Sequence, residues 1–276
     1  MESTPSLGIN ADSVTLDQLI AVAVGNSRTR VGLVKDNACH DASSFETSDP
    51  KSIGARVREL SQSQDEPPIV VISTVDPSAA DDIERAIKDA GPLSVYRIGR
   101  DVPISIEHAL TDSGAMTVGQ DRLLCAIGAF EHLKQACVVV DLGTAVTIDF
   151  VDGAGTFHGG AILPGVSMML DALHENTAAL PKLTYTKIDP GSSDPGRQTD
   201  DAMILGVTAA VRGAVRLLTE RYAEFYSAYP LVIATGGDLG ILEDEELVET
   251  LAPDLQLMGI HAACVRALQD DESDDD

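Results

Sequence analysis

The chain has 276 residues, of which 44% are hydrophobic and only 4% aromatic, so we expect a core of aliphatic side chains. Single domains usually have about 100–150 residues, and this length therefore predicts two domains around one cleft. The formal net charge of −25 argues against binding to nucleic acid or to an anionic membrane surface, because both need clustered Lys and Arg.

Residues 1–16 are polar and are expected to form a loose extension. In the first half, a polar loop over 61–68 precedes an apolar run that is typical of a strand covered on both faces. The ordered elements expected there are strands at 19–24, 30–34, 69–73 and 94–98, and a helix at 79–90.

The second half begins with a helical pattern from Gly119. Its further elements are strands at 137–140, 146–151, 156–163 and 231–235, a long helix from Thr199 and a closing helix at 254–268. The apolar stripe of the long helix has steps of three or four residues and consists of Ile204, Val207, Val211, Val215, Leu218, Tyr222 and Phe225. Strands and helices alternate in both halves, which indicates the α/β class. Residues 269–276 are strongly acidic and predict a disordered, solvated tail.

The cysteines and the N-terminus indicate a compartment. Cys39, Cys125, Cys137 and Cys264 form no CxxC pair, so zinc or dithiol chemistry is disfavoured and reduced, mostly buried thiols are expected. The N-terminus does not have the pattern of a signal peptide, and no apolar run approaches the ~20 residues of a membrane-spanning helix. We therefore expect a cytoplasmic protein.

An internal repeat relates the two halves. The segment Val22–Ser27, followed by Val31–Val34, matches Val140–Ala145, followed by Val146–Val151, and Gly25 aligns with Gly143 at an offset of 118 residues. Each copy reads as strand, glycine turn, strand. Two copies of one unit suggest a duplicated fold with a cleft between them.

The second glycine turn has the sequence Asp141-Leu142-Gly143-Thr144. Its glycine lets backbone N–H groups approach phosphate oxygens, its Thr hydroxyl adds a hydrogen bond, and its Asp can hold a cation. An ordinary β-hairpin is the alternative for such a motif alone. The related turn at Gly25 and a third one at Thr235-Gly236-Gly237 favour nucleotide binding.

The segment Gly119-Gln120-Asp121-Arg122 lies at a predicted helix start. Asp121 alone would be an ordinary first-turn acid that the helix dipole stabilises. A carboxylate beside an Arg is also what a kinase needs, because one group accepts the proton of the attacking hydroxyl and the other holds an anionic substrate.

These motifs together resemble the type III pantothenate kinase family, over roughly residues 19–268. The resemblance rests on 119–122, 140–149, Gly159–Gly165 with the positions that follow up to Pro181, 196–199 and 235–238. It implies duplicated ribonuclease H-like (actin-like ATPase) domains with a central cleft, at 17–135 and 136–268. It further implies ATP-dependent phosphorylation of pantothenate to 4′-phosphopantothenate, the first step of coenzyme A synthesis, by a homodimer that uses Mg²⁺ and K⁺ or NH₄⁺.

The resemblance also implies roles for residues. Asp121 would be the general base, and Gly119, Gln120, Arg122 and Thr199 would contact pantothenate with it. Thr199 would in addition cap the long helix. Asp141 would hold the monovalent cation and Thr144 would contact ATP. The first phosphate loop would consist of Ala23, Val24, Gly25, Asn26, Ser27, Arg28, Thr29 and Arg30.

The first loop departs from the family pattern Asp-x-Gly-Asn, because Ala23 stands where the acid is expected and where the repeat has Asp141. A methyl group cannot organise Mg²⁺ and phosphates, so Asp149, or water held by Asn26, would have to help. Loss of such charge stabilisation commonly costs about a hundredfold in rate. A smaller departure is Leu110-Thr111-Asp112, where the family often has a Tyr near the substrate.

Two alternatives come from other classes of protein. The first is a non-catalytic, regulator-like relative, which Ala23 would favour. The second is a phosphatase or another kinase of the same superfold, against which the 119–122 and 159–165 motifs argue.

Overall fold

The computed structural model describes residues 16–64, 68–187 and 195–274. It divides into a first unit of Met1–His132 with Asp254–Asp276 and a second unit of Leu133–Pro253. The predicted domains, 17–135 and 136–268, placed the closing helix in the second half, whereas the structure places it in the first unit. The predicted extension at 1–16 lies outside the described residues except for Leu16.

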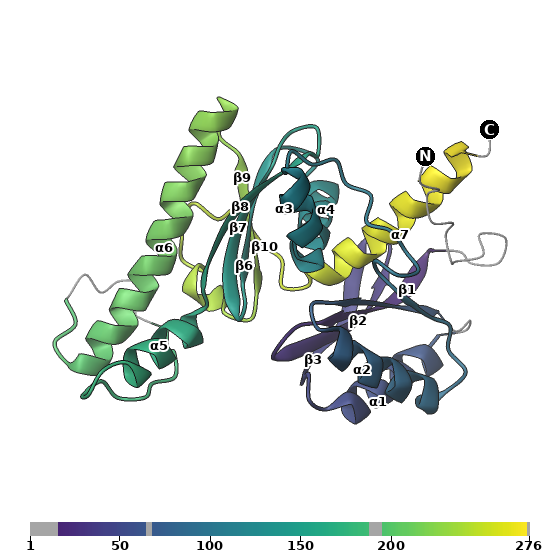
Figure 1. Ribbon diagram of the computed structural model, residues 1–276, viewed down its shortest axis with the longest axis horizontal. Helices are drawn as coiled ribbons and strands as arrows, with labels where there is room; N and C mark the ends of the chain where they lie inside the picture. The colour runs from purple at the N-terminus through teal and green to yellow at the C-terminus, as the bar shows by residue number, and fades with distance from the viewer. Residues whose placement is uncertain (1–15, 65–67, 188–194, 275–276) are drawn as a thin grey trace. The chain divides into compact units, whose positions relative to one another are not determined.

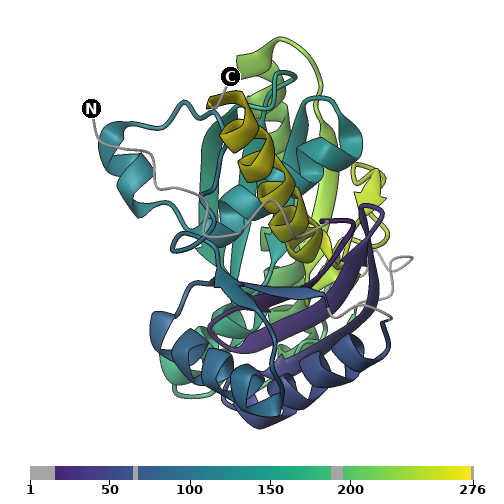
Figure 2. The ribbon, with the colours of Figure 1, turned by 90° about the vertical axis from the view of Figure 1, so that its right-hand side faces the viewer.

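The first unit is a five-stranded mixed sheet between two helical layers. Residues of α1 and α2 pack on Ile20, Val22 and Val24, and residues of α4 and α7 pack on the opposite face at Leu19 and Ala21. Figure 2 shows α1 and α2 on one side of the purple strands and the yellow α7 on the other. The strand order is β3-β2-β1-β4-β5. The elements are β1 (Gln18–Val24), β2 (Arg28–Lys35), β3 (Ala38–Glu46), α1 (Pro50–Gln62), β4 (Ile69–Thr74), α2 (Pro77–Ala90), β5 (Val95–Arg97), α3 (Asp112–Thr117), α4 (Gln120–Leu133) and α7 (Leu255–Asp274).

The second unit has a sheet of order β10-β9-β6-β7-β8. One face, with Val138, Val140 and Ile148, packs against α5 and α6, and Figure 1 shows α6 lying along this sheet. The elements are β6 (Cys137–Leu142), β7 (Ala145–Val151), β8 (Phe157–Pro164), α5 (Val166–Glu175), α6 (Thr199–Tyr226), β9 (Leu231–Gly236), the 3₁₀ turn η2 (Leu239–Ile241) and β10 (Thr250–Leu251).

The two sheets have one topology, which confirms the predicted duplicated fold. In the first, β1 pairs antiparallel with β2 and parallel with β4, and these pair with β3 and β5. In the second, β6 corresponds to β1, and it pairs antiparallel with β7 and parallel with β9. These two strands pair in turn with β8 and β10, as β2 and β4 pair with β3 and β5. The first hairpin has one residue more, since its last pair is Val24 with Thr29 and that of the second is Leu142 with Val146.

Several elements differ from the predictions. The strands β3 and β10 and the helices α1 and α3 were not predicted. β3 is mostly exposed and does not have an apolar run, whereas α1 has an Asp49 cap and buried Ile53, Val57 and Leu60 that the sequence already displays. The acidic segment predicted as a disordered tail is helical as far as Asp274, because α7 continues through it.

The long helix α6 was predicted correctly in position, but not in every contact. Phe225, the last member of its predicted stripe, is 66% exposed, although its ring still lies against Phe150. By length and composition alone, α6 is the one helix in the described ranges that would suffice to cross a membrane, although no apolar run had suggested one. Since a core helix passes the same test, and Val207, Val211 and Val215 lie in the core, this is weak evidence for a span.

Candidate functional site

The second glycine turn lies where β6 ends. Asp141 is half-buried and pairs across the sheet with Thr147 of β7 and Thr235 of β9. The N–H of Gly143 donates to the carbonyl of Ala145 at 3.1 Å, and Thr144 is exposed. The turn therefore presents an acid and a hydroxyl at the edge where parallel strands end, which is a usual place for ligands in α/β sheets.

The third glycine turn lies at the same edge. The N–H of Asp238 donates to the carbonyl of Leu142 at 3.0 Å, so this turn is joined to the end of β6. Burial raises the pKa of the Asp238 carboxyl. Asp238 is thus a second acid of this edge, and it is the last residue of the 235–238 motif that this chain shares with the family.

The first glycine turn is tied to the strand that follows it. The N–H of Gly25 donates to the carbonyl of Arg28 at 3.1 Å. The Thr47 hydroxyl donates to the Gly25 carbonyl at 2.9 Å, and the Thr47 N–H donates to the carbonyl of Ser27 at 3.1 Å. Thr47, which the sequence did not single out, therefore fixes the shape of this turn.

Ala23 has a charged neighbour on the opposite strand. In the ladder it lies directly across from Arg30 and beside Ser73, and only 3% of its surface is exposed. Arg30 forms an ion pair with Asp254, the residue before α7. Position 23 has no carboxylate of its own, but the residue opposite it, Arg30, is paired with the Asp254 carboxylate, which is far away in the sequence.

The first turn fits an anion better than a divalent cation. The Nε of Arg30 is buried and has no hydrogen-bond partner among the described residues, and such an unsatisfied donor suggests a ligand oxygen or a water. The Asp254 carboxylate is already engaged by Arg30, and the methyl of Ala23 cannot bind a metal. Across the described ranges, no three His, Cys, Asp or Glu side chains are grouped so that they could hold one.

Asp149, the substitute proposed for the missing acid, lies within the second sheet rather than at a turn. It is 2% exposed and stands across from Val139 and Gly160 in the ladders. A Cβ at Gly160 would lie 2.5 Å from its Oδ1. This placement within the sheet, rather than at a turn, does not support a metal-binding role for Asp149.

The substrate motif opens α4, as the sequence predicts. Asp121 lies in the first turn of the helix, and its Oδ1 accepts a hydrogen bond from the N–H of Arg122 at 2.9 Å. The carboxylate folds back over Gly119, where any Cβ would collide with it. Glycine at 119 is thus needed for this position of the acid.

Gln120 carries an unpaired acceptor. Its Oε1 is buried and has no hydrogen-bond partner among the described residues. Buried polar atoms are normally satisfied, so an unsatisfied one suggests a ligand group or a water. The four residues 119–122 are all half-buried.

Thr199 does not have the predicted capping role. α6 begins at Thr199, the cap position belongs to Gln198, and Gln198 makes no side-chain cap hydrogen bond. Thr199 is exposed. Its hydroxyl is therefore not explained by helix capping, and its predicted contact with the substrate stays a prediction.

The structure groups the predicted residues by unit. The first unit holds the loop 23–30 and the motif 119–122, and the second unit holds Asp141, Thr144 and Thr199. A cavity of about 600 Å³ lies elsewhere, between α1 and α2, and none of the predicted residues lines it.

Comparison with known proteins decides the family. The model of the type III pantothenate kinases matches residues 19–221. The chain belongs to the type III pantothenate kinase family.

Curated members of this family are similar over different lengths. One from Rubrobacter xylanophilus is 29% identical over 88% of this chain and 95% of its own. One from Rhodopirellula baltica is 47% identical, but that match spans about half of each protein, 46%. One from Gluconobacter oxydans is 41% identical over 61% of this chain and 67% of its own.

A solved structure supports the fold of this family member. It is described as a Baf family transcriptional activator from Campylobacter jejuni, and it matches 91% of this chain and 100% of its own with a TM-score of 0.56. At 16% sequence identity, this likeness concerns the fold alone.

Proposed function

We propose that the chain transfers the γ-phosphoryl group of ATP to pantothenate and forms 4′-phosphopantothenate, the first step of coenzyme A synthesis. The observation that carries this proposal is the start of α4, where the Asp121 carboxylate is held over Gly119 beside Arg122. Membership of the type III pantothenate kinase family supports the substrate.

The residues of this motif have distinct roles in the proposed reaction. Asp121 accepts the proton of the substrate hydroxyl as that oxygen attacks phosphorus. Arg122 pairs with the substrate carboxylate, for which a guanidinium is well suited. The unpaired Oε1 of Gln120 accepts a hydrogen bond from a hydroxyl or amide of pantothenate. Gly119 and Thr199 complete these contacts.

The glycine turns serve the nucleotide. The loop from Ala23 to Arg30 binds phosphate oxygens, with the buried Nε of Arg30 as a donor, and Thr144 contacts ATP from the second turn. ATP supplies the phosphoryl group, and Mg²⁺ accompanies it. The described residues of the first turn do not form a Mg²⁺ site of their own, so we assign no step to the metal. Asp141 suits K⁺ or NH₄⁺ as one oxygen donor among several.

We further propose a homodimer in the cytoplasm. The family resemblance implies the dimer, and α6 supports it with an exposed stripe at Gly206, Ala210, Gly213 and Leu217, where Leu217 is 65% exposed. Such spacing puts all four on one helix face. The cytoplasm is supported by the four free cysteines.

The dimer can be tested by mass in solution. The wild type is expected at twice 29.0 kDa, and Leu217→Glu is expected to shift it towards the monomer, because a charge then enters the contact. Light scattering on a sizing column measures this. Ala228→Glu, at an exposed position beyond α6, is the control that should remain dimeric. A monomeric wild type would exclude the dimer.

The proposed reaction can be tested directly. Purified protein with ATP, Mg²⁺ and K⁺ is expected to release ADP only when pantothenate is added, and the product should have the mass of phosphopantothenate. A coupled ADP assay and mass spectrometry measure the two. ADP release without pantothenate would indicate another ATPase or phosphatase of this superfold instead.

A further inference from the structure

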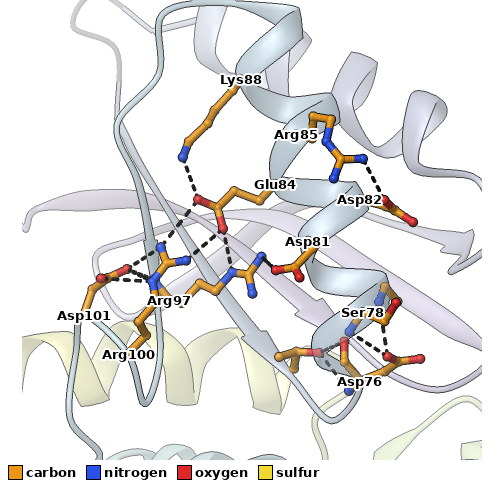
Figure 3. Close-up of polar contacts among 12 residues, drawn as sticks. Asp76, Ser78, Asp81, Asp82, Glu84, Arg85, Lys88, Arg97, Arg100 and Asp101 are labelled. Atoms are coloured by element: carbon orange, nitrogen blue, oxygen red, sulfur yellow. Dashed lines mark hydrogen bonds and ion pairs between the residues drawn. The ribbon is translucent and has the colours of Figure 1, made fainter.

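A cluster of six charged side chains joins α2 to the turn after β5 (Figure 3). Glu84 of α2 lies at its centre and forms ion pairs with Lys88 at 2.6 Å, Arg97 at 2.6 Å and Arg100 at 3.1 Å. Arg97 also pairs with Asp81 at 2.7 Å, and Arg100 pairs with Asp101 at 2.7 Å. The cluster gathers three basic residues in a chain that has only 19.

The centre of the cluster is shielded from water. The side chains of Glu84 and Arg97 are 9% and 10% exposed. Burial by itself would raise the pKa of the Glu84 carboxyl, but the hydrogen bonds from Lys88 and Arg100 and the charge of Arg97 outweigh it and lower the pKa to about 2. Glu84 is therefore charged at any physiological pH, and separating it from its partners would leave a buried charge unpaired.

The same residues set the path of the backbone after β5. The N–H of Arg97 donates to Oδ2 of Asp101 at 2.8 Å. The carbonyl of Arg97 accepts from the N–H groups of Asp101 at 2.8 Å and Val102 at 3.1 Å, and the N–H of Gly99 donates to the carbonyl of Val102 at 2.7 Å. The turn over residues 97–102 is thus closed by its own bonds and anchored to α2 by Glu84.

This turn touches the substrate motif. Gly99 has a φ of +81°, and a Cβ placed on it would collide with Nε2 of Gln120. The backbone at Gly99 therefore lies against the Gln120 amide, whose other end is the buried, unpaired Oε1. The position of the turn decides where that acceptor can lie.

We propose that the cluster centred on Glu84 is a positioning device, which holds the turn 97–102 against Gln120 and so tunes the affinity for pantothenate. A buried ion pair is weak evidence for stability, since well-packed apolar residues often serve equally well. The hydrogen bonds of such a cluster do fix geometry, however. Here they fix the turn whose backbone at Gly99 lies against the Gln120 amide. This inference rests on the proposed function of the motif 119–122.

Two variants test the inference. Glu84→Gln keeps the shape and removes the charge that anchors Arg97 and Arg100. Gly99→Ala keeps all six charges of the cluster and places a methyl group against the Gln120 amide, and the φ of +81° also strains the turn for any residue other than glycine. Each is expected to raise KM for pantothenate about tenfold, the value of one misplaced hydrogen bond, with kcat and KM for ATP within about twofold. Steady-state rates at varied pantothenate and varied ATP measure this split.

Asp82→Asn is the matched control. Asp82 lies on the same helix as Glu84, and its exposed side chain pairs only with Arg85 among the ion pairs of the described residues. The control also removes one negative charge, and it should leave both KM values unchanged.

The outcomes separate the inference from the proposed function. An active wild type with unchanged KM for pantothenate in both variants would overturn the positioning role alone, as would equal changes in both KM values. A folded Gly99→Ala protein tests the inference even if Glu84→Gln does not fold. A wild type without pantothenate-dependent turnover would overturn the proposed function and, with it, this role.

Discussion

Asp121→Asn is expected to lower kcat for pantothenate phosphorylation by about 100- to 10,000-fold, the usual contribution of a general base. Asparagine has the same size as aspartate, but its amide cannot take up the proton of the attacking hydroxyl. The amide oxygen can still accept the N–H of Arg122, which Oδ1 does at 2.9 Å in the wild type. The substitution should therefore remove the chemistry and leave the start of α4 in place.

The measurement is kcat at saturating ATP and pantothenate, with pantothenate binding followed separately by calorimetry. Binding is expected to persist, because Arg122 and Gln120 remain. Asp82→Asn is a matched control, since Asp82 is likewise a helix carboxylate of the first unit and its exposed side chain pairs with Arg85. A kcat of Asp121→Asn within a few-fold of the wild type would remove Asp121 from the role of base.

The fold could be predicted from sequence because its signals are local and occur twice. The apolar runs at Val22 and Val140, each followed by a glycine turn, gave the central strands of both sheets. The ladders then showed that the copies agree strand by strand. β3 escaped prediction because an exposed edge strand needs no apolar run. The helix α1 escaped it although its cap and its spaced Ile53, Val57 and Leu60 were signals that could have been used.

The candidate site was predictable where its residues are neighbours in the sequence. The motif from Gly119 to Arg122 does lie at a helix start. The pairing of Arg30 with Asp254 joins positions 224 apart, and no local pattern indicates such a contact. The contact of Gly99 with Gln120 was equally hidden, because the glycine reads as an ordinary turn residue until the packing is known.

The two glycine turns differ in more than the acid. The first turn has one residue more than the second. Before the first turn Ala23 pairs with Arg30, whereas before the second Asp141 pairs with Thr147. The first hairpin thus has the Arg30 guanidinium at the strand position where the second has the neutral hydroxyl of Thr147. This difference agrees with the proposal that the first turn contacts phosphate directly and that the second turn, through Asp141, contacts a cation.

Ala23→Asp is expected to raise kcat/KM for ATP about a hundredfold when Mg²⁺ is present, because it supplies the charge that the first turn does not have. Position 23 is buried, so an isolated carboxylate would be costly there. Arg30 lies directly opposite and would offset part of that cost, in competition with Asp254. We expect a less stable but faster enzyme.

The gain should depend on charge and on metal. Ala23→Asn has the same shape without the charge and should show no increase, and the gain of Ala23→Asp should disappear when Mg²⁺ is withdrawn. Initial rates of ADP formation at varied ATP and Mg²⁺ measure both. A folded Ala23→Asp protein without any gain would mean that Arg30 and Asp254 already provide what the first turn requires. If the wild type were inactive and Ala23→Asp active, the chain would instead be a relative that has kept the fold and lost the reaction. One restored carboxylate would then be enough to restore the activity.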